Sequence, residues 1–222
     1  MMASQSSVLK AMVVVTIVAV SAFGQTWKDI AGVANKTATV TDKRDGQKYR
    51  AVTIGGKTWM AEDLNYKTGN SWCYNDSDSY CKKYGRLYDW ETAKTACLAG
   101  WHLPTVQEWD NLSEAVGGVR KSVKIGSEDV FYWDGAGKKL KSTSGWYDNG
   151  NGTDNYGFTA LPGGGRSSGG RFLNAGNNGH WWTATENGSG NAYLRDMRYN
   201  SDNVYEYYFV AGIGFSVRCV RD

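Results

Sequence analysis

The chain has 222 residues and a formal net charge of +3, with 28 glycines, 2 prolines, 10 tryptophans and 14 tyrosines. This length predicts one domain with a sizeable core. The densest basic run is only Lys138, Lys139 and Lys141. Nucleic-acid binding normally shows as a basic face or cluster, so the composition argues against a nucleic-acid partner. The many glycine and aromatic residues favour a domain that contains sheet and long loops.

The N-terminus has the pattern of a signal peptide over residues 1–24. Lys10 is followed by an uncharged, mostly apolar run from Ala11 to Phe23. A membrane-spanning helix needs about 20 such residues, so this shorter run predicts the h-region of a secretory signal. We place the cleavage between Gly24 and Gln25, and an uncleaved signal anchor is the alternative. The mature protein is then exported to the periplasm, the cell surface or the medium, with no stable membrane span.

Residues 25–45 are mixed and polar and predict an N-terminal linker, in which residues 37–41 suit an edge strand. The domain itself is predicted over residues 46–222. Between Lys48 and Leu64, two β-rich runs surround Gly55-Gly56, which predicts a hairpin.

Two amphipathic helices are expected next. The first shows an apolar stripe at three- and four-residue steps, formed by Leu87, Trp90, Ala93, Lys94 and Cys97. The second begins with Thr105 and Glu108 at capping-box spacing and ends at Gly117-Gly118. Its apolar residues are Trp109, Leu112 and Val116.

Beyond residue 120 the sequence predicts no helix. Short β-prone pieces alternate with loops rich in Gly, Asn, Asp and Ser, at residues 130–133, 158–161, 181–185, 193–199, 204–210 and 215–220. The predicted fold class is therefore α+β, with two helices packed on a twisted, mainly antiparallel sheet and a long loop-rich second half.

A turn at residues 200–203 predicts how the two strands beside it pair. Tyr199 is expected opposite Val204, and Arg195 opposite Tyr208. Because side chains alternate along a strand, Tyr193, Arg195, Met197 and Tyr199 are expected to share one face.

The four cysteines lie after the signal, in a compartment where disulfides persist. Three pairings are possible. Cys73 and Cys81 are close in the sequence, which favours a local bridge and leaves Cys97 to pair with Cys219. A zinc site is the alternative, but it needs closely spaced pairs such as C-x-x-C, which these spacings do not supply.

Several motifs closely resemble one known family, the Fibrobacter succinogenes major paralogous domain. They are VTIGGKTWMAEDLNY (52–66), WCYND (72–76), YGRLYDWETAKTAC (84–97), GWHLPTVQEWDNL (100–112), GKKLKSTSGW (137–146), GTDNYGFTALPGG (152–164), WWTATE (181–186) and GFSVRCV (214–220). The resemblance covers roughly residues 40–222, in order.

This resemblance implies an exported bacterial protein, often predicted to be surface or lipid-anchored. It also implies a fold similar to C-type lectin-like and formylglycine-generating-enzyme-like domains. In C-type lectin-like domains a cysteine that ends the first helix pairs with one in the last strand, which agrees with the Cys97 to Cys219 pairing. The family's biochemical function is largely unassigned.

No metal or other cofactor is expected. The calcium motifs of true C-type lectins do not occur, and the closest oxygen-rich stretch is the loop from Asp148 to Asn155. This loop does not follow the EF-hand pattern, so a mobile Asx/Gly turn is expected, with Ca²⁺ as the alternative.

Catalysis is not expected either. All four cysteines have a structural partner, so a free thiol nucleophile is missing. The chain has two histidines, His102 and His180. His102 lies in a helix approach and His180 at a strand start, which favours structural roles over general-base chemistry.

Aromatic residues are the main candidates for ligand binding. Trp133, Trp146 and Tyr147, like Trp72, sit in polar, glycine-rich stretches where no apolar pattern predicts burial. Anchoring of the loops by packing is the alternative. With the sheet face, the candidate ligand-binding residues are Trp133, Trp146, Tyr147, Tyr193, Arg195, Tyr199 and Tyr205. Rings beside polar side chains suit a carbohydrate or another extracellular ligand, so a non-catalytic binding module is the first hypothesis. A structural or protein-interaction component of the cell envelope is the second.

Export gives the first testable prediction. Mass spectrometry of the mature protein should show an N-terminus at or near Gln25, because the signal peptide is removed on export. An intact Met1 in washed periplasmic or culture fractions would contradict it.

Overall fold

The computed structural model describes residues 37–188 and 190–222. The predicted signal peptide, its cleavage site and the first part of the predicted linker lie outside the described residues. A compact unit extends from Asn35 to Asp222. The edge strand at Ala38–Thr41, which lies before the predicted domain start at residue 46, pairs with the strand at Lys48–Ile54.

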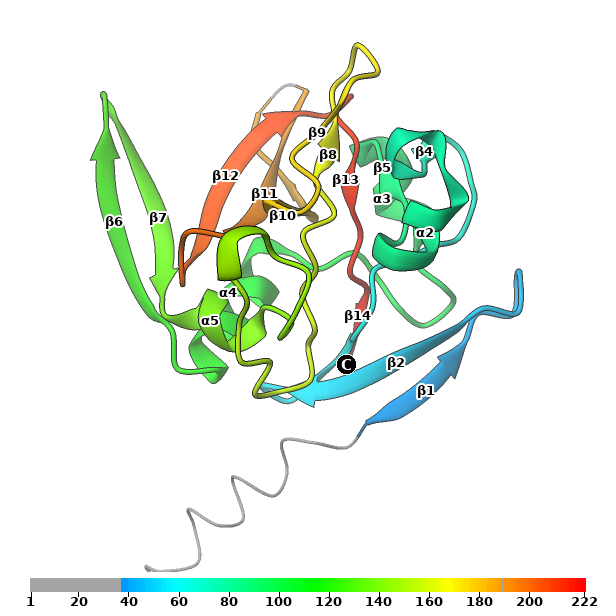
Figure 1. The fold of residues 1–222 in the computed structure, drawn as a ribbon, viewed down its shortest axis with the longest axis horizontal. Helices are drawn as coiled ribbons and strands as arrows, with labels where there is room; N and C mark the ends of the chain where they lie inside the picture. The colour runs from blue at the N-terminus through cyan, green and yellow to red at the C-terminus, as the bar shows by residue number, and fades with distance from the viewer. Residues whose placement is uncertain (1–36, 189) are drawn as a thin grey trace, which may run out of the picture. The chain divides into compact units, whose positions relative to one another are not determined.

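The described chain contains two main sheets (Figure 1). The first has four strands, in the order β1 (Ala38–Thr41), β2 (Lys48–Ile54), β3 (Lys57–Met60) and β14 (Val220–Arg221). The second has eight, in the order β4 (Ser71–Trp72), β5 (Leu87–Tyr88), β13 (Phe215–Ser216), β10 (Asn178–Glu186), β11 (Asn191–Arg198), β12 (Val204–Val210), β7 (Glu128–Asp134) and β6 (Val119–Ile125). Neighbouring strands are antiparallel except β10 and β13. A short hairpin joins β8 (Gly165–Arg166) to β9 (Phe172–Leu173).

The described helices are short. They are α2 (Asp78–Tyr84), α3 (Trp90–Ala96), α4 (Val106–Ala115) and α5 (Ala136–Leu140), with single 3₁₀ turns η1 (Tyr74–Asp76) and η2 (Tyr147–Asn149). None of the helices in residues 37–188 and 190–222 is long and apolar enough to cross a membrane. The elements confirm an α+β fold with mainly antiparallel sheets.

The second predicted helix and its capping box are confirmed in α4. The Thr105 side chain accepts a hydrogen bond from the Glu108 backbone N–H, and the Glu108 carboxylate accepts one from the Thr105 N–H at 2.8 Å. The first predicted helix starts later than its stripe indicates, because Leu87 belongs to β5 and the Asp89 side chain caps the N-terminus of α3. The prediction of no helix beyond residue 120 is wrong for α5.

Two hydrophobic cores lie on opposite faces of the eight-stranded sheet. Trp181 and Trp182 are consecutive in β10 and therefore point to opposite faces. Trp182 packs in one core with residues of α3 such as Trp90. Trp181 packs in the other core with residues of α4 such as Trp109. We call these the α3 face and the α4 face of the sheet.

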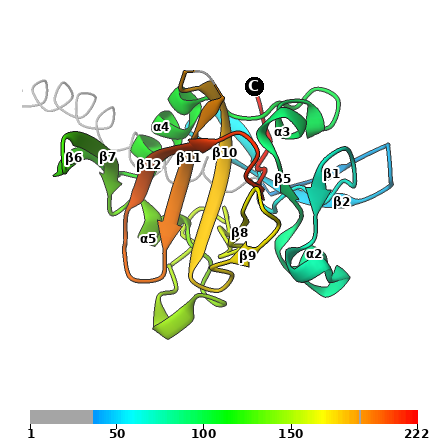
Figure 2. The ribbon, with the colours of Figure 1, turned by 90° about the horizontal axis from the view of Figure 1, so that it is seen from above.

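The predicted pairing of β11 with β12 is wrong by two residues. Arg195 lies opposite Glu206, not Tyr208, and Asp196 lies opposite Tyr205. Strand β11 ends at Arg198 and its last partner in β12 is Tyr205, so Tyr199 is not paired with Val204, and the Tyr199 N–H donates to the Asn177 carbonyl. The connection is thus longer than the predicted turn. Figure 2 shows β10, β11 and β12 side by side.

One buried ion pair joins the two sheets. Arg218, between β13 and β14, has no exposed surface, and its Nε donates to the Asp63 carboxylate at 2.7 Å. The same carboxylate oxygen accepts a hydrogen bond from the Trp181 indole N–H at 2.8 Å. Another Arg218 nitrogen donates to the Phe158 carbonyl. Burial raises the pKa of Asp63, and Arg218 and Trp181 oppose that shift.

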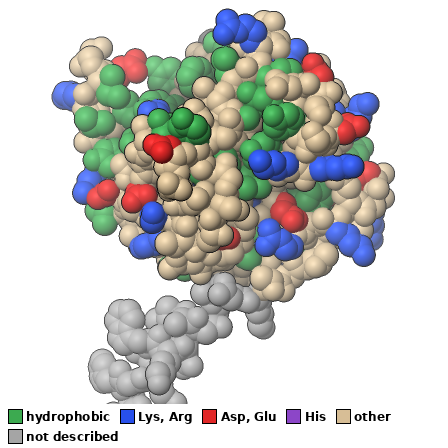
Figure 3. Space-filling model, viewed as in Figure 1, with side chains coloured by type: hydrophobic (Ala, Val, Ile, Leu, Met, Phe, Trp, Pro, Cys, Tyr) green, Lys and Arg blue, Asp and Glu red, His purple; other side chains and the backbone are tan. Residues whose placement is uncertain are grey.

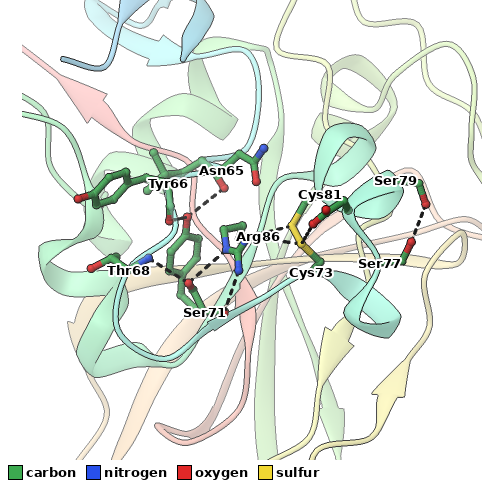
Figure 4. Close-up of a disulfide and its surroundings, with 12 residues drawn as sticks. Asn65, Tyr66, Thr68, Ser71, Cys73, Ser77, Ser79, Cys81 and Arg86 are labelled. Atoms are coloured by element: carbon green, nitrogen blue, oxygen red, sulfur yellow. Dashed lines mark hydrogen bonds between the residues drawn. A yellow bond between two sulfur atoms is a disulfide. The ribbon is translucent and has the colours of Figure 1, made fainter. Parts of the chain in front are cut away.

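Both predicted disulfides are present. Cys73 bonds to Cys81, and Cys97, the C-cap of α3, bonds to Cys219 immediately before β14. All four thiols are therefore used, which fits an exported protein. In Figure 4, Arg86 points to the local bridge, where its Nη1 lies 3.4 Å from each sulfur. Its Nε donates to the Ser71 hydroxyl, which ties the bridge to β4.

The long bridge should contribute more stability than the local one. Replacing Cys97 and Cys219 together by serine should lower the free energy of unfolding by about 2 to 5 kcal/mol, because the bridge closes a long loop in the unfolded chain. The matched change of Cys73 and Cys81 should cost less and mainly loosen the segment around Trp72. Urea unfolding of the oxidised proteins measures both. Equal losses, or a larger loss for the local pair, would contradict this ranking.

Candidate ligand-binding surface

An aromatic surface lies on the α3 face of the eight-stranded sheet. Tyr205 lies opposite Asp196 and Tyr207 opposite Leu194, which packs in the α3-side core. Tyr132 of β7 lies opposite Tyr205 on the other side. Cross-strand pairing puts these side chains on one face, and all three tyrosines are partly exposed. With Arg198, which follows Asp196 by two residues in β11, they form what we call the aromatic platform.

The rings and the guanidinium of the aromatic platform are in contact. The ring centroids of Tyr205 and Tyr207 lie 6.0 Å apart with a small interplanar angle of 28°, and Tyr132 lies 5.7 Å from Tyr205. The Arg198 guanidinium lies 4.9 Å from the Tyr205 centroid and 5.2 Å from that of Tyr207. The surface therefore combines flat apolar faces with a fixed cation.

A buried carboxylate fixes the position of this cation. Asp196 is 1% exposed, and one of its oxygens accepts a hydrogen bond from Arg198 Nε at 2.6 Å. Nδ1 of His180 lies 3.1 Å from the other oxygen. Burial would raise the pKa of Asp196, but His180 and Arg198 more than offset it and hold the pKa below its ordinary value. The carboxylate is thus ionised at neutral pH and holds Arg198 in place.

A polar pocket of roughly 300 Å³ adjoins the aromatic platform. It is lined by Lys138, Asp148, Asn149, Gly150, Asn151, Tyr199, Asn200, Ser201 and Asp202. The Ser201 hydroxyl lies 3.1 Å from the Tyr205 hydroxyl, so the pocket and the platform meet at this contact. Tyr147 stands beside the pocket, with its ring 5.3 Å from that of Tyr199 in an edge-to-face arrangement.

A buried lysine supports the turn that lines this pocket. Lys141 is 1% exposed, and its Nζ donates to the carbonyls of Ser201 at 2.8 Å and Arg198 at 3.1 Å. Burial lowers the pKa of Lys141 to about 8, although Asp202 partly opposes this shift. The geometry of the β11 to β12 connection therefore depends on an amine whose pKa is lowered to about 8 by burial.

The structure brings three of the seven candidate residues to this surface. Tyr205 belongs to the aromatic platform, Tyr199 lines the pocket, and Tyr147 is 61% exposed beside it. Tyr193 lies on the α4 face instead, since it pairs with Tyr208 and alternates with Leu194.

The expected exposure of the other three candidates is wrong. Trp133 and Arg195 are 0% exposed and Trp146 is 4% exposed. Trp133 packs in the α4-side core, and Arg195 is buried there because it forms ion pairs with Asp110 of α4 and Glu206 of β12. Packing also explains Trp146, whose indole N–H donates to the Ala160 carbonyl.

In the oxygen-rich loop from Asp148 to Asn155, the side chains of Asn151 and Asp154 hydrogen-bond to neighbouring residues of the protein. Both Asp154 carboxylate oxygens accept hydrogen bonds from Thr159, at 2.7 and 2.8 Å. The Asn151 side chain accepts one from the Trp146 N–H. No group of three or more His, Cys, Asp or Glu side chains in the described residues is arranged to hold a metal ion. Asp154 thus has a structural role, and these contacts give no support for Ca²⁺.

The sequence reasoning missed Tyr132, His180, Asp196, Arg198 and Tyr207 as members of this surface. It placed Asp196 and Arg198 on the face opposite Arg195, which is correct, but chose the Arg195 face as the binding face. The alternation of Tyr205 and Tyr207 with Glu206 was the available signal. Only the position of α4 shows which of the two faces is covered.

The family model of the Fibrobacter succinogenes major domain matches residues 52–221. The chain belongs to this family. No curated protein and no solved structure matches the chain.

The pKa of Lys141 predicts a pH dependence of stability. Its folded-state pKa of about 8 lies below the ordinary value of 10.5, so the unfolded chain binds more protons between these values. The free energy of unfolding should therefore rise relative to that of Lys141→Met as the pH increases from about 8 to 10. Chemical unfolding of both proteins across this range measures the difference.

Lys43→Met is the control, because Lys43 is an exposed lysine whose charge is not among those that shift the pKa of Lys141. The free energy of unfolding of the original protein relative to this control should change less with pH than its free energy of unfolding relative to Lys141→Met. Parallel pH profiles for the original protein and Lys141→Met would show that Lys141 titrates normally.

Proposed function

We propose that the chain is an exported, non-catalytic binding module that recognises carbohydrate through the aromatic platform. The observation that carries this proposal is the pairing of Tyr205 and Tyr207 beside Arg198, whose guanidinium is held by buried Asp196. Sugar rings have apolar faces that pack on flat aromatic rings and hydroxyl groups that accept hydrogen bonds from a guanidinium. Because Arg198 is already fixed, little side-chain entropy is lost on binding.

The adjoining pocket supports the same proposal. Its lining is almost entirely polar, with amide, hydroxyl and carboxylate groups from two loops. A chain of sugar units that rests on the aromatic platform would meet these groups at the Ser201 and Tyr205 contact. This division between an apolar surface for rings and polar groups for orientation is common in ligand sites.

We further propose that the α+β fold is C-type lectin-like. The Cys97 to Cys219 bridge supports this, since it joins the end of a helix to the last strand of the chain. The non-catalytic assignment is supported by the use of all four thiols in disulfides. His180 supports it as well, because its Nδ1 faces the carboxylate that fixes Arg198.

A second candidate function is a protein-interaction role in the cell envelope. The hairpin of β6 and β7 projects from the rest of the sheet in Figures 1 and 2, and every residue of β6 is exposed. Its exposed apolar residues include Val119, Val123 and Ile125. An exposed edge strand of this kind can pair with a strand of another protein.

A face-specific pair of variants tests the carbohydrate proposal. Tyr207→Ala should weaken binding to a polysaccharide identified on a glycan array by about tenfold or more, because stacked rings dominate such contacts. Tyr193→Ala removes a tyrosine from the opposite face of the neighbouring strand β11 and should leave the affinity unchanged. Affinity electrophoresis measures both, and thermal unfolding confirms that both variants are folded.

Two outcomes would overturn the proposal. If no glycan or plant polymer binds while a pull-down from envelope extract yields one partner protein, the interaction role replaces it. If Tyr193→Ala weakens glycan binding and Tyr207→Ala does not, the binding face is the α4 face.

A further inference from the structure

A second aromatic surface lies around the hairpin of β8 and β9. Four partly exposed rings gather there, from Trp72, Tyr74, Tyr80 and Phe172. The Tyr74 ring lies 5.1 Å from that of Tyr80 and 5.2 Å from that of Phe172. Figure 3 shows hydrophobic side chains gathered between this hairpin and helix α2. This surface is separate from the aromatic platform and shares no residue with it.

Arg166 of β8 lies at this surface. Its guanidinium stacks 4.1 Å from the Trp72 ring centroid and lies 5.8 Å from that of Phe172. Its backbone is fixed by two hydrogen bonds to Gly214, of 2.9 and 2.7 Å. The side chain is therefore held between an aromatic ring and the rest of the hairpin.

The Arg166 side chain differs from the other arginines that are buried or half-buried in residues 37–188 and 190–222. Four of these donate side-chain hydrogen bonds, namely Arg86, Arg195, Arg198 and Arg218. Within the described chain, the Arg166 side chain has no hydrogen bond and no ion pair with an acid. Its Nε is buried and unpartnered, as is the Nε of Arg195, but Arg195 donates through another nitrogen of its guanidinium. A desolvated guanidinium nitrogen without an acceptor is costly, so the position calls for an acceptor from outside the chain.

A glycine of the hairpin lies beside the guanidinium. Gly170 has a φ of +91°, a conformation that L side chains rarely adopt. A Cβ added at Gly170 would lie 3.1 Å from Nη2 of Arg166. Glycine therefore permits a close approach to the planar fork of donors, whose geometry matches the two oxygens of a carboxylate.

We propose that Arg166, stacked on Trp72 and bordered by Gly170, is the anion-binding residue of a second site that accepts a carboxylate. The surrounding rings would contact the apolar part of the ligand that carries it. An acidic sugar and an acidic peptide side chain both present this group. The inference does not depend on carbohydrate binding at the aromatic platform.

Titration of the full domain with small carboxylates tests this site. The probes are galacturonate and N-acetylaspartate, with galactose as the neutral counterpart of the sugar acid. The readout is the NMR resonance of the Arg166 Nε–H group, identified by its loss in Arg166→Lys. At least one of the two acids should shift this resonance in a saturable way, and galactose should not. The acid that binds more tightly distinguishes a sugar source from a peptide source.

Arg166→Gln and Arg171→Gln form a matched pair on the same hairpin. Arg166→Gln should weaken binding of the acid at least tenfold, measured by calorimetry, while Arg171→Gln, at an exposed position, should not. Arg166→Gln should remain folded because it removes no side-chain hydrogen bond. An unchanged Nε–H resonance with both acids, or equal binding by Arg166→Gln, would overturn the proposal. Repeating the titration with Tyr207→Ala shows that the result does not involve the aromatic platform.

Discussion

The buried contact among Arg218, Asp63 and Trp181 connects most parts of this fold. Asp63 follows strand β3 of the first sheet, and Trp181 belongs to the long strand β10 of the second sheet. Arg218 donates to the Asp63 carboxylate and to the Phe158 carbonyl, so it connects the segment near Phe158 to this contact. Removing one partner of a buried ion pair typically costs about 3 to 5 kcal/mol, because the other charge stays buried without compensation. The position of β10, and with it the placement of both cores, depends on this contact.

From β10 outward, the two faces of the sheet have different uses. Helix α4 covers the part of the α4 face around Arg195, which forms ion pairs that hold the helix and strand β12 together. The α3 face is covered only in part, which leaves Tyr205 and Tyr207 accessible beside Arg198. Each face thus places an arginine next to a carboxylate. Arg195 links helix α4 to strand β12 on the α4 face, and Arg198 forms part of the exposed surface on the α3 face.

Local patterns predicted much of the fold. The glycine turn of the first hairpin, the capping box of α4 and the Cys73 to Cys81 bridge were predicted correctly because each depends on residues close in sequence. The Cys97 to Cys219 bridge followed because these were the two cysteines left. Helix α5 has only five residues and begins after Gly135, so it shows no period, and helix α2 buries only Cys81 and Tyr84, which do not form an apolar stripe. The site was harder to predict. Trp146 lies in a polar stretch and Arg195 is itself charged, and their burial, like that of Trp133, results from contacts with distant segments that no local pattern reveals.

The Cys97 to Cys219 bridge also has a mechanical consequence. It encloses a sequence separation of 122 residues, and β10, β11 and β12 all lie within it. If the ends of the chain are pulled apart, force passes through the covalent bridge and bypasses this loop. About 400 Å of contour length is then protected from extension. The strands that carry the aromatic platform would stay paired under tension that unravels the segment before Cys97, so a tethered molecule would keep this surface intact under flow.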